Sequence, residues 1–143
     1  MTTSKDVADD AMLDRLREGK VIQIAPQGVS MLPFIRGGRD KVLLRKTEHV
    51  DVGNIVLVEY RGRLILHRVY AVNGSLLTLM GDGNLHGTEQ VDVDKVLATA
   101  VGVVKPGGRC RKPHKAWLWR HTLAMRKWLL KVDRKWNKWF DKQ

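Results

Sequence analysis

Between residues 21 and 104 the chain is a succession of short segments rich in β-branched residues and separated by Gly, Asn and Asp. Segments of this kind are typical of β-strands. The joints Tyr60-Arg61-Gly62-Arg63 and Val72-Asn73-Gly74-Ser75 resemble tight hairpins, and Asn-Gly suits a type I′ turn. The spacing predicts a mainly β fold, a small antiparallel β-sandwich or barrel. The expected strands cover residues 21–24, 41–45, 55–60, 63–72, 75–80 and 96–104.

The composition changes sharply near residue 105. Residues 1–104 contain 13 basic and 13 acidic side chains, whereas residues 105–143 contain 13 basic ones against only Asp133 and Asp141. The whole net charge of +11 and all five tryptophans therefore belong to this last segment. The stretch 105–109, Lys-Pro-Gly-Gly-Arg, is a break between the two parts.

A short helix is expected before the strands, over residues 5–18. Val7, Met12, Leu13 and Leu16 have mostly helical spacing, and Ser4 is a candidate N-cap. We therefore divide the chain into four parts. They are an N-terminal helical segment (1–19), a β domain (20–104), a linker (105–114) and a basic, Trp-rich amphipathic helix (115–143).

The C-terminal helix has three interpretations. An apolar stripe that includes Trp136 and Trp139 lies on one side and Lys and Arg residues lie broadly opposite, an arrangement suited to an anionic membrane interface. The other members of the stripe are Leu118, Met125, Leu129, Val132 and Phe140. A helix that docks on the β domain and exposes a solvated basic face would show the same pattern. Basic residues near aromatic ones also suit single-stranded nucleic acid, but no recognised nucleic-acid-binding fold accompanies them, so nucleic acid is not the favoured partner.

Several other classes of protein fit the sequence poorly. The single cysteine, Cys110, excludes an internal disulfide and fits a reducing compartment. No apolar stretch approaches the length needed to span a bilayer, and the first twenty residues do not resemble a signal peptide. The five histidines have no paired spacing typical of zinc sites, and no nucleotide-binding glycine loop is present. We expect no metal and no cofactor.

Ser30 and His67 are the candidate catalytic residues. Ser30 lies in a turn between Gly28 and Pro33, and an exposed serine becomes a nucleophile only when a neighbouring base takes its proton. Histidine is suited to that task near neutral pH. Strand alternation places His67 on one face with Ile65 and Val69. Taken alone, however, His67 also fits a hydrogen-bonded core residue, and Ser30 an ordinary turn residue.

Five short blocks in a fixed order carry a resemblance to a known family. They are residues 30–33 (Ser-Met-Leu-Pro), 40–43 (Asp-Lys-Val-Leu), 52–56 (Val-Gly-Asn-Ile-Val), 66–69 (Leu-His-Arg-Val) and 81–84 (Gly-Asp-Gly-Asn). The chain thereby resembles the signal-peptidase and repressor-cleaving serine peptidases over residues 21 to 104, in the branch whose base is histidine. The resemblance implies a β-fold of signal-peptidase type.

The resemblance also implies roles for individual residues. Ser30 would be the nucleophile and its backbone N–H an oxyanion donor, His67 the base, and Asp82 the acid that orients the base. The family's second acid falls at Thr88, with Glu89 adjacent. Where signal peptidases commonly carry a second hydroxyl residue, this chain has Gly28.

The sequence therefore predicts a serine endopeptidase that cleaves a peptide or protein precursor with a Ser-His dyad. It also predicts a cytoplasmic protein with a fraction on the inner face of the membrane, attached through residues 115–143. The alternative is a non-enzymatic β-module whose basic tail binds a membrane surface or nucleic acid. Neither the substrate nor the oligomeric state follows from the sequence.

Overall fold

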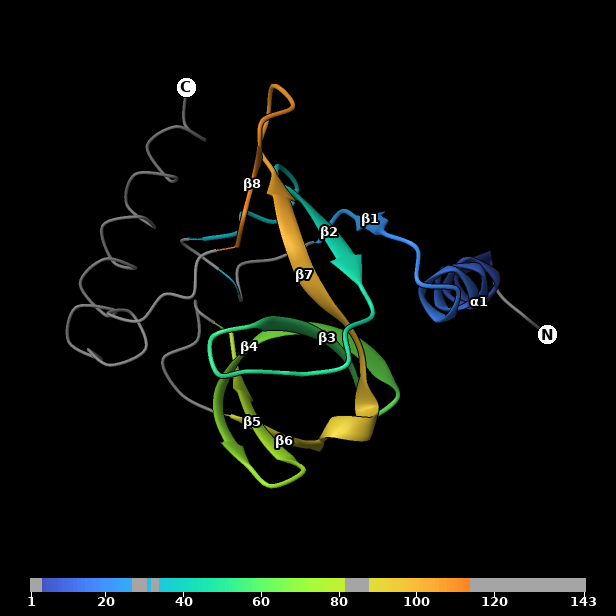
Figure 1. Cartoon of the computed structure of the whole chain (residues 1–143). Helices are drawn as coiled ribbons and strands as arrows, with labels where there is room; N and C mark the ends of the chain where they lie inside the picture. The colour runs from blue at the N-terminus through green and yellow to red at the C-terminus, as the bar shows by residue number, and fades with distance from the viewer. Residues whose placement is uncertain (1–3, 27–30, 32–33, 82–87, 114–143) are drawn as a thin grey trace.

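The computed structural model describes residues 4–26, 31, 34–81 and 88–113. In this part of the chain a single helix precedes a β-sheet, with a 3₁₀ turn between two of the strands (Figure 1). The elements are α1 (Ser4–Arg17), β1 (Ile22–Ile24), β2 (Lys41–Arg45), β3 (Ile55–Tyr60), β4 (Arg63–Asn73), β5 (Leu76–Met80), β6 (Glu89–Asp92), η1 (Val93–Lys95), β7 (Val96–Val104) and β8 (Cys110–Arg111).

The eight strands form one sheet in the order β1-β2-β7-β3-β4-β5-β6, with β8 also paired to β7, and every pairing is antiparallel. The long strand β7 joins two regions, because residues 96–99 pair with β3 and residues 99–104 pair with β2. Figure 1 shows β1, β2 and β8 around one end of β7, and β3 to β6 curled around the other.

The mainly β, antiparallel fold predicted from the sequence is confirmed, but a closed barrel is not found. Within the described residues β1 pairs only with β2 and β6 pairs only with β5, so the sheet remains open. The helix expected over residues 115–143 lies outside the described residues.

The sheet buries apolar side chains on both faces, and β3 contributes to both. Ile55 and Leu57 belong to one cluster, whereas Val56 and Val58 belong to the other, because successive side chains of a strand point to opposite faces. All four are at most 4% exposed. The first cluster is Leu16, Ile22, Met31, Ile35, Val42, Leu44, Ile55, Leu57, Ala98, Ala100 and Val103, and the second is Val56, Val58, Val69, Leu77, Leu79 and Val91.

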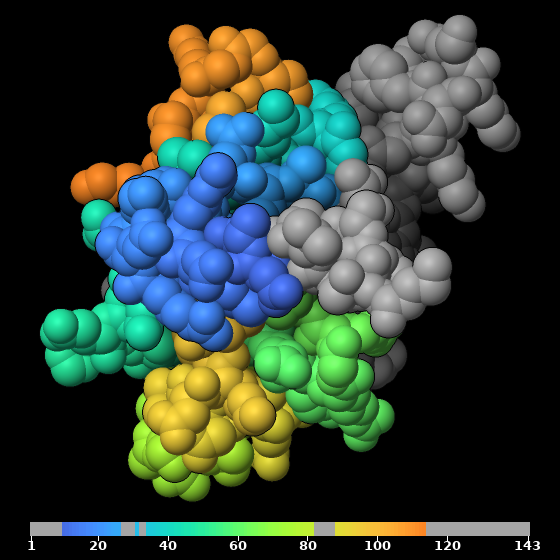
Figure 2. Space-filling model, turned by 90° about the vertical axis from the view of Figure 1, so that its right-hand side faces the viewer, coloured from blue at the N-terminus to red at the C-terminus, as the bar shows by residue number. Residues whose placement is uncertain are grey.

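Helix α1 covers part of the first cluster through Leu16, which is 2% exposed. Figure 2 shows the outer side of this helix, in blue, at the surface between the orange β7–β8 end and the yellow η1 region. The helix thus packs on the face of the sheet that carries the first cluster, next to β1 and β7.

The two predicted hairpins are present, with one difference in register. Tyr60 pairs with Arg63, and the intervening Arg61 and Gly62 both have positive φ (51° and 75°), as a type I′ turn requires. In the second hairpin Asn73 pairs with Leu76, so the loop is residues 74–75 and not the expected 73–74. Only Gly74 has positive φ there (62°), as in a type II′ turn.

Candidate active site

His67 lies in the middle of β4 and is 7% exposed. Its partner across the β3–β4 ladder is Val56, which belongs with Val69 to the second cluster, and Ile65 packs against the same cluster. Leu64 and Leu66 pack on the first cluster instead. The face predicted for His67 from strand alternation is therefore confirmed.

A carboxylate contacts the His67 ring. Nδ1 of His67 lies 2.9 Å from Oε2 of Glu89, and the two side chains are 9% and 18% exposed. Because an ionised carboxylate only accepts hydrogen bonds, we assign a proton to Nδ1. In the neutral ring Nε2 is then the nitrogen that carries the free lone pair, which is the arrangement a general base needs. Within the described residues Nε2 has no hydrogen-bond partner.

The strand order explains how residues 22 positions apart meet. Glu89 pairs with Leu79 of β5, and Leu79 pairs with Val69 of β4, two residues along from His67 and on the same face. Two strand spacings put the β4 and β6 backbones roughly 10 Å apart. Figure 1 shows strands β3 to β6 curling, which turns β6 back toward β4. The 2.9 Å contact shows that the His67 and Glu89 side chains span the remaining gap.

Arg68, the residue after His67, is fully buried on the opposite face of β4. Its guanidinium donates to the backbone oxygen of Gly53 at 2.7 Å and lies 5.3 Å from the centre of the Phe34 ring. Phe34 belongs to the segment that follows the predicted nucleophile. The strand of the candidate base therefore contacts the segment of the candidate nucleophile through Arg68.

Ser30, Gly28 and Asp82 lie outside the described residues, so the structure does not place the predicted nucleophile or the predicted orienting acid. The chain on either side of Ser30 is described. Met31 is 4% exposed within the first cluster, and the backbone oxygen of Pro26 accepts a hydrogen bond from Gly38 N at 3.0 Å. Residues 26 and 38 are thus held together at the base of the loop that contains Ser30.

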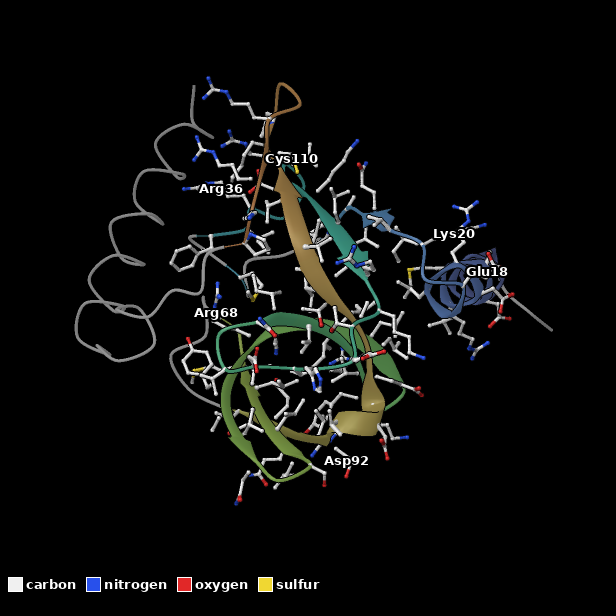
Figure 3. All side chains as sticks on the ribbon, viewed as in Figure 1. Glu18, Lys20, Arg36, Arg68, Asp92 and Cys110 are labelled. Atoms are coloured by element: carbon white, nitrogen blue, oxygen red, sulfur yellow. The ribbon has the colours of Figure 1, made fainter. Side chains whose placement is uncertain are left out.

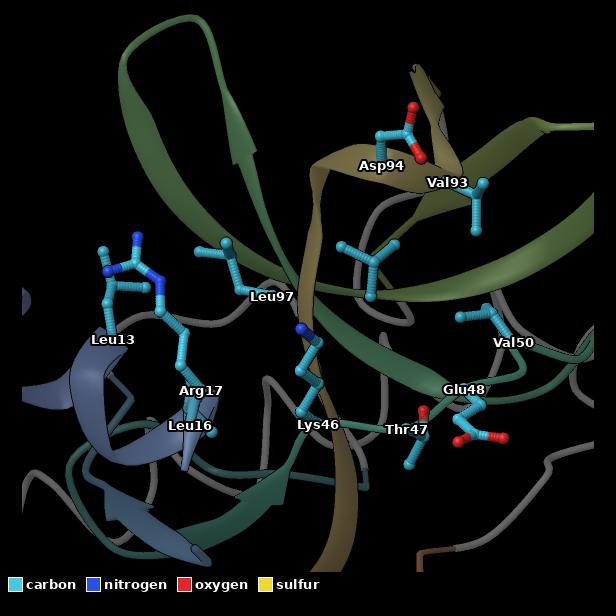
Figure 4. Close-up of a pocket in the computed structure, with 11 residues that line it drawn as sticks. Leu13, Leu16, Arg17, Lys46, Thr47, Glu48, Val50, Val93, Asp94 and Leu97 are labelled. Carbon is cyan, nitrogen blue, oxygen red and sulfur yellow. The ribbon is translucent and has the colours of Figure 1, made fainter. Parts of the chain in front are cut away.

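A separate cavity of about 520 Å³ lies between α1, the β2–β3 connection and the start of β7 (Figure 4). Neither His67 nor Glu89 lines it, so it is distinct from the histidine–carboxylate pair. Its lining residues are Leu13, Leu16, Arg17, Lys46, Thr47, Glu48, Val50, Val93, Asp94, Val96 and Leu97.

Two other features of the described residues bear on function. No group of three or more His, Cys, Asp or Glu residues in them is arranged to hold a metal ion. No helix in the same residues is long and apolar enough to cross a membrane.

The comparisons with known proteins add no assignment. No protein-family model matches the sequence, and no curated protein matches it.

Glu89 is the site residue that sequence reasoning did not select. It was identified only as the neighbour of Thr88, the position of the family's second acid. The signal available was the weak alternation of residues 89–92, Glu-Gln-Val-Asp, which forms β6 with Val91 buried.

Proposed function

We propose that the protein is a serine endopeptidase in which Ser30 is the nucleophile, His67 the general base and Glu89 the residue that orients the base. The observation that carries the proposal is the 2.9 Å contact between His67 Nδ1 and Glu89. A histidine held at Nδ1 by a largely buried carboxylate is the base-and-orienter half of a catalytic triad. It occurs at the position that the resemblance to the signal-peptidase family assigns to the base.

The chemistry follows that of other serine peptidases. Ser30 Oγ attacks the carbonyl carbon of the scissile bond while His67 Nε2 takes the hydroxyl proton, and the same nitrogen then donates this proton to the leaving amine. Water then attacks the acyl-enzyme while His67 Nε2 takes one of its protons, and the same nitrogen returns a proton to Ser30 Oγ as it leaves. Glu89 accepts a hydrogen bond from the Nδ1–H group throughout and stabilises the imidazolium form of His67. The substrate in this proposal is a peptide or protein precursor.

A fluorophosphonate probe tests the proposal without knowledge of the substrate. In this reaction Ser30 Oγ forms a bond to phosphorus, fluoride leaves, and His67 takes the hydroxyl proton. We expect labelling of the full-length protein, mapped to Ser30 by mass spectrometry of peptides. The variants Ser30→Ala and His67→Ala should abolish it while the circular dichroism spectrum is unchanged.

His49 provides a matched control, because it lies in an exposed loop position. His49→Ala should label at the wild-type rate. Labelling that survives His67→Ala, or that maps to a serine other than Ser30, would overturn the proposed dyad and favour the non-enzymatic β-module.

We also propose that the protein works in the cytoplasm, with a fraction at the inner face of the membrane through residues 115–143. The support is the charge of +11 and the five tryptophans that residues 105–143 carry. Basic residues near an anionic surface contribute about 1 kcal/mol each, and the contribution falls as salt rises.

Sedimentation with vesicles tests this attachment. The full chain should sediment with phosphatidylglycerol-containing vesicles at low salt, less at high salt, and not with pure phosphatidylcholine vesicles. Trp136→Ala/Trp139→Ala should weaken sedimentation. A chain that ignores anionic vesicles at low salt would contradict membrane attachment and favour a helix that binds the β domain or a protein partner.

A further inference from the structure

Residues 34–40, a few positions after Ser30, form turns and no strand. Ile35 is 2% exposed in the first cluster, and the backbone N–H groups of Phe34 and Ile35 donate to the backbone oxygen of Met31 at 3.1 and 3.0 Å. The backbone N–H of Asp40 donates to the Arg36 oxygen at 2.9 Å. Residues 34–40 are therefore a short, internally bonded segment with a buried apolar anchor.

A buried carboxylate closes this segment. Oδ2 of Asp40, whose side chain is 1% exposed, accepts hydrogen bonds from the Arg36 backbone N–H at 2.9 Å and from Nζ of Lys105 at 2.7 Å. Lys105 follows the last residue of β7. Its Nζ also donates to the backbone oxygen of Phe34 at 3.1 Å. One ammonium group thus bonds to both ends of the segment and attaches it to the end of β7.

Phe34 contacts two cations, Lys105 just after β7 and Arg68 within β4. Lys105 binds its backbone oxygen, and Arg68 of β4 covers its ring. Arg68 is the chain neighbour of His67. Residues 34–40 are therefore attached both to β4, the strand of the candidate base, and to the end of β7.

We propose that Lys105 is a positioning residue for the peptidase reaction. By neutralising Asp40 and bonding to Phe34, it fixes residues 34–40 relative to β4 and β7, and with them Met31, whose backbone oxygen accepts from Phe34 and Ile35. Because Ser30 directly precedes Met31 in the chain, we expect this anchor to position the nucleophile. This inference rests on the proposed function. A buried charge that loses its partner is strongly unfavourable, so the segment must rearrange when Lys105 is removed. A nucleophile displaced by about 1 Å can lose 10²-fold in rate.

The experiment measures fluorophosphonate labelling of Ser30 in three variants of the full chain. For Lys105→Met we expect the maximal labelling rate, kinact, to fall about 10- to 100-fold, while the half-saturating probe concentration, KI, stays within about twofold. Lys105→Arg keeps the charge and should recover most of kinact. Asp40→Asn, which keeps an oxygen for Arg36 N–H and removes the buried charge, should lower kinact less than Lys105→Met does.

Lys20→Met is the matched control. Lys20 forms an ion pair with Glu18 at 2.8 Å, but the two side chains are 65% and 57% exposed. Figure 3 shows this pair beside α1, on the other side of the molecule from Arg36 and Arg68. The control should leave kinact, KI and the melting temperature unchanged, because exposed pairs contribute little.

Amide hydrogen exchange separates the two proposals. Lys105→Met should speed exchange at the amides of Ile35, Gly38 and Asp40, with a smaller change at Val58 in the centre of the sheet. An unchanged kinact would overturn the positioning role, and so would a fall in labelling that merely follows the unfolded fraction and is not restored by Lys105→Arg. If wild-type Ser30 is not labelled, the proposed function fails and the positioning role fails with it. If amide exchange at residues 34–40 is unaltered in Lys105→Met, Lys105 does not hold this segment, whatever the labelling result.

Discussion

Replacing Glu89 by glutamine tests the orientation of His67 most directly, because it changes one oxygen to an NH₂ group of nearly the same size. The carboxylate accepts from Nδ1 at 2.9 Å in a site where it is 18% exposed. An amide NH₂ in the same position can donate to Nδ1, which would move the ring proton to Nε2. A protonated Nε2 cannot accept the serine proton. In Ser-His-Asp peptidases the corresponding change lowers kcat about 10⁴-fold, and we expect a loss of about 10³- to 10⁴-fold in the labelling rate of Ser30.

The cost in stability should be much smaller than the loss in rate. One charge-assisted hydrogen bond contributes about 1.5–3 kcal/mol, and the amide retains part of it as a neutral bond, so we expect a loss of about 1–2 kcal/mol in the free energy of unfolding. Urea titration measures this quantity. A fall in labelling with a native-like midpoint would therefore report orientation of the ring and not unfolding.

Nitrogen-15 NMR of the imidazole ring gives the tautomer without any activity measurement. In its neutral form the wild-type His67 ring should show a protonated Nδ1 and an unprotonated Nε2, and Glu89→Gln should reverse the pattern. The ring of His49, exposed in a loop, should give the same signals in the two proteins. A wild-type ring protonated at Nε2 would refute the assignment, and so would identical tautomers in wild type and variant.

Two further predictions concern the sheet that carries the pair. Leu79→Ala should lower the free energy of unfolding by about 2–5 kcal/mol, because Leu79 is fully buried between β4 and β6, whereas Leu76→Ala on the same strand, at 39% exposure, should cost less than about 1 kcal/mol in the same urea titration. Gly102→Ala should cost about 1–3 kcal/mol in thermal unfolding, because a Cβ there would lie 3.0 Å from Cys110 Sγ and 3.1 Å from Leu43 Cδ1. Cys110→Ala should relieve part of that cost if the contact with Sγ is its cause.

The strands that were predicted well from the sequence are those whose residues have a high strand propensity of their own. Residues 41–45, 55–60 and 96–104 are rich in Val, Leu and Ile and are bounded by turn residues, and the structure has β2, β3 and β7 at these bounds. The expected helix at 5–18 differs from α1 (Ser4–Arg17) by one residue at each end. Local sequence was sufficient to predict these elements, because each has the apolar periodicity of its own secondary structure and is flanked by turn or capping residues.

Two strands were missed because pairing, and not propensity, creates them. Residues 89–92 include Glu89 and Asp92, acids that are depleted in strands, yet they form β6 by pairing with β5. Asp92 then ends the strand, since its side chain accepts the backbone N–H of Asp94 and begins η1. Cys110 and Arg111 pair with the end of β7, inside the range expected to be a linker, once positive φ at Gly107 and Gly108 reverses the chain.

The same distinction explains what was foreseen of the site. Strand alternation predicts the face on which His67 lies, and residues 66–69 carry the resemblance to the base of the peptidase family. His67 could therefore be selected from the sequence of a single strand. Its carboxylate partner could not, because the contact depends on the order β4-β5-β6, on the register that aligns Glu89 with Leu79, and on a curl that turns β6 toward β4. Each of these is a property of the assembled sheet. A shift of β6 by one residue would direct the side chain of Glu89 to the other face, away from His67. The pairing of β5 with β6 is therefore as much a part of the candidate site as the two side chains, and substitutions that loosen β6 should affect the orientation of His67 before they affect the fold.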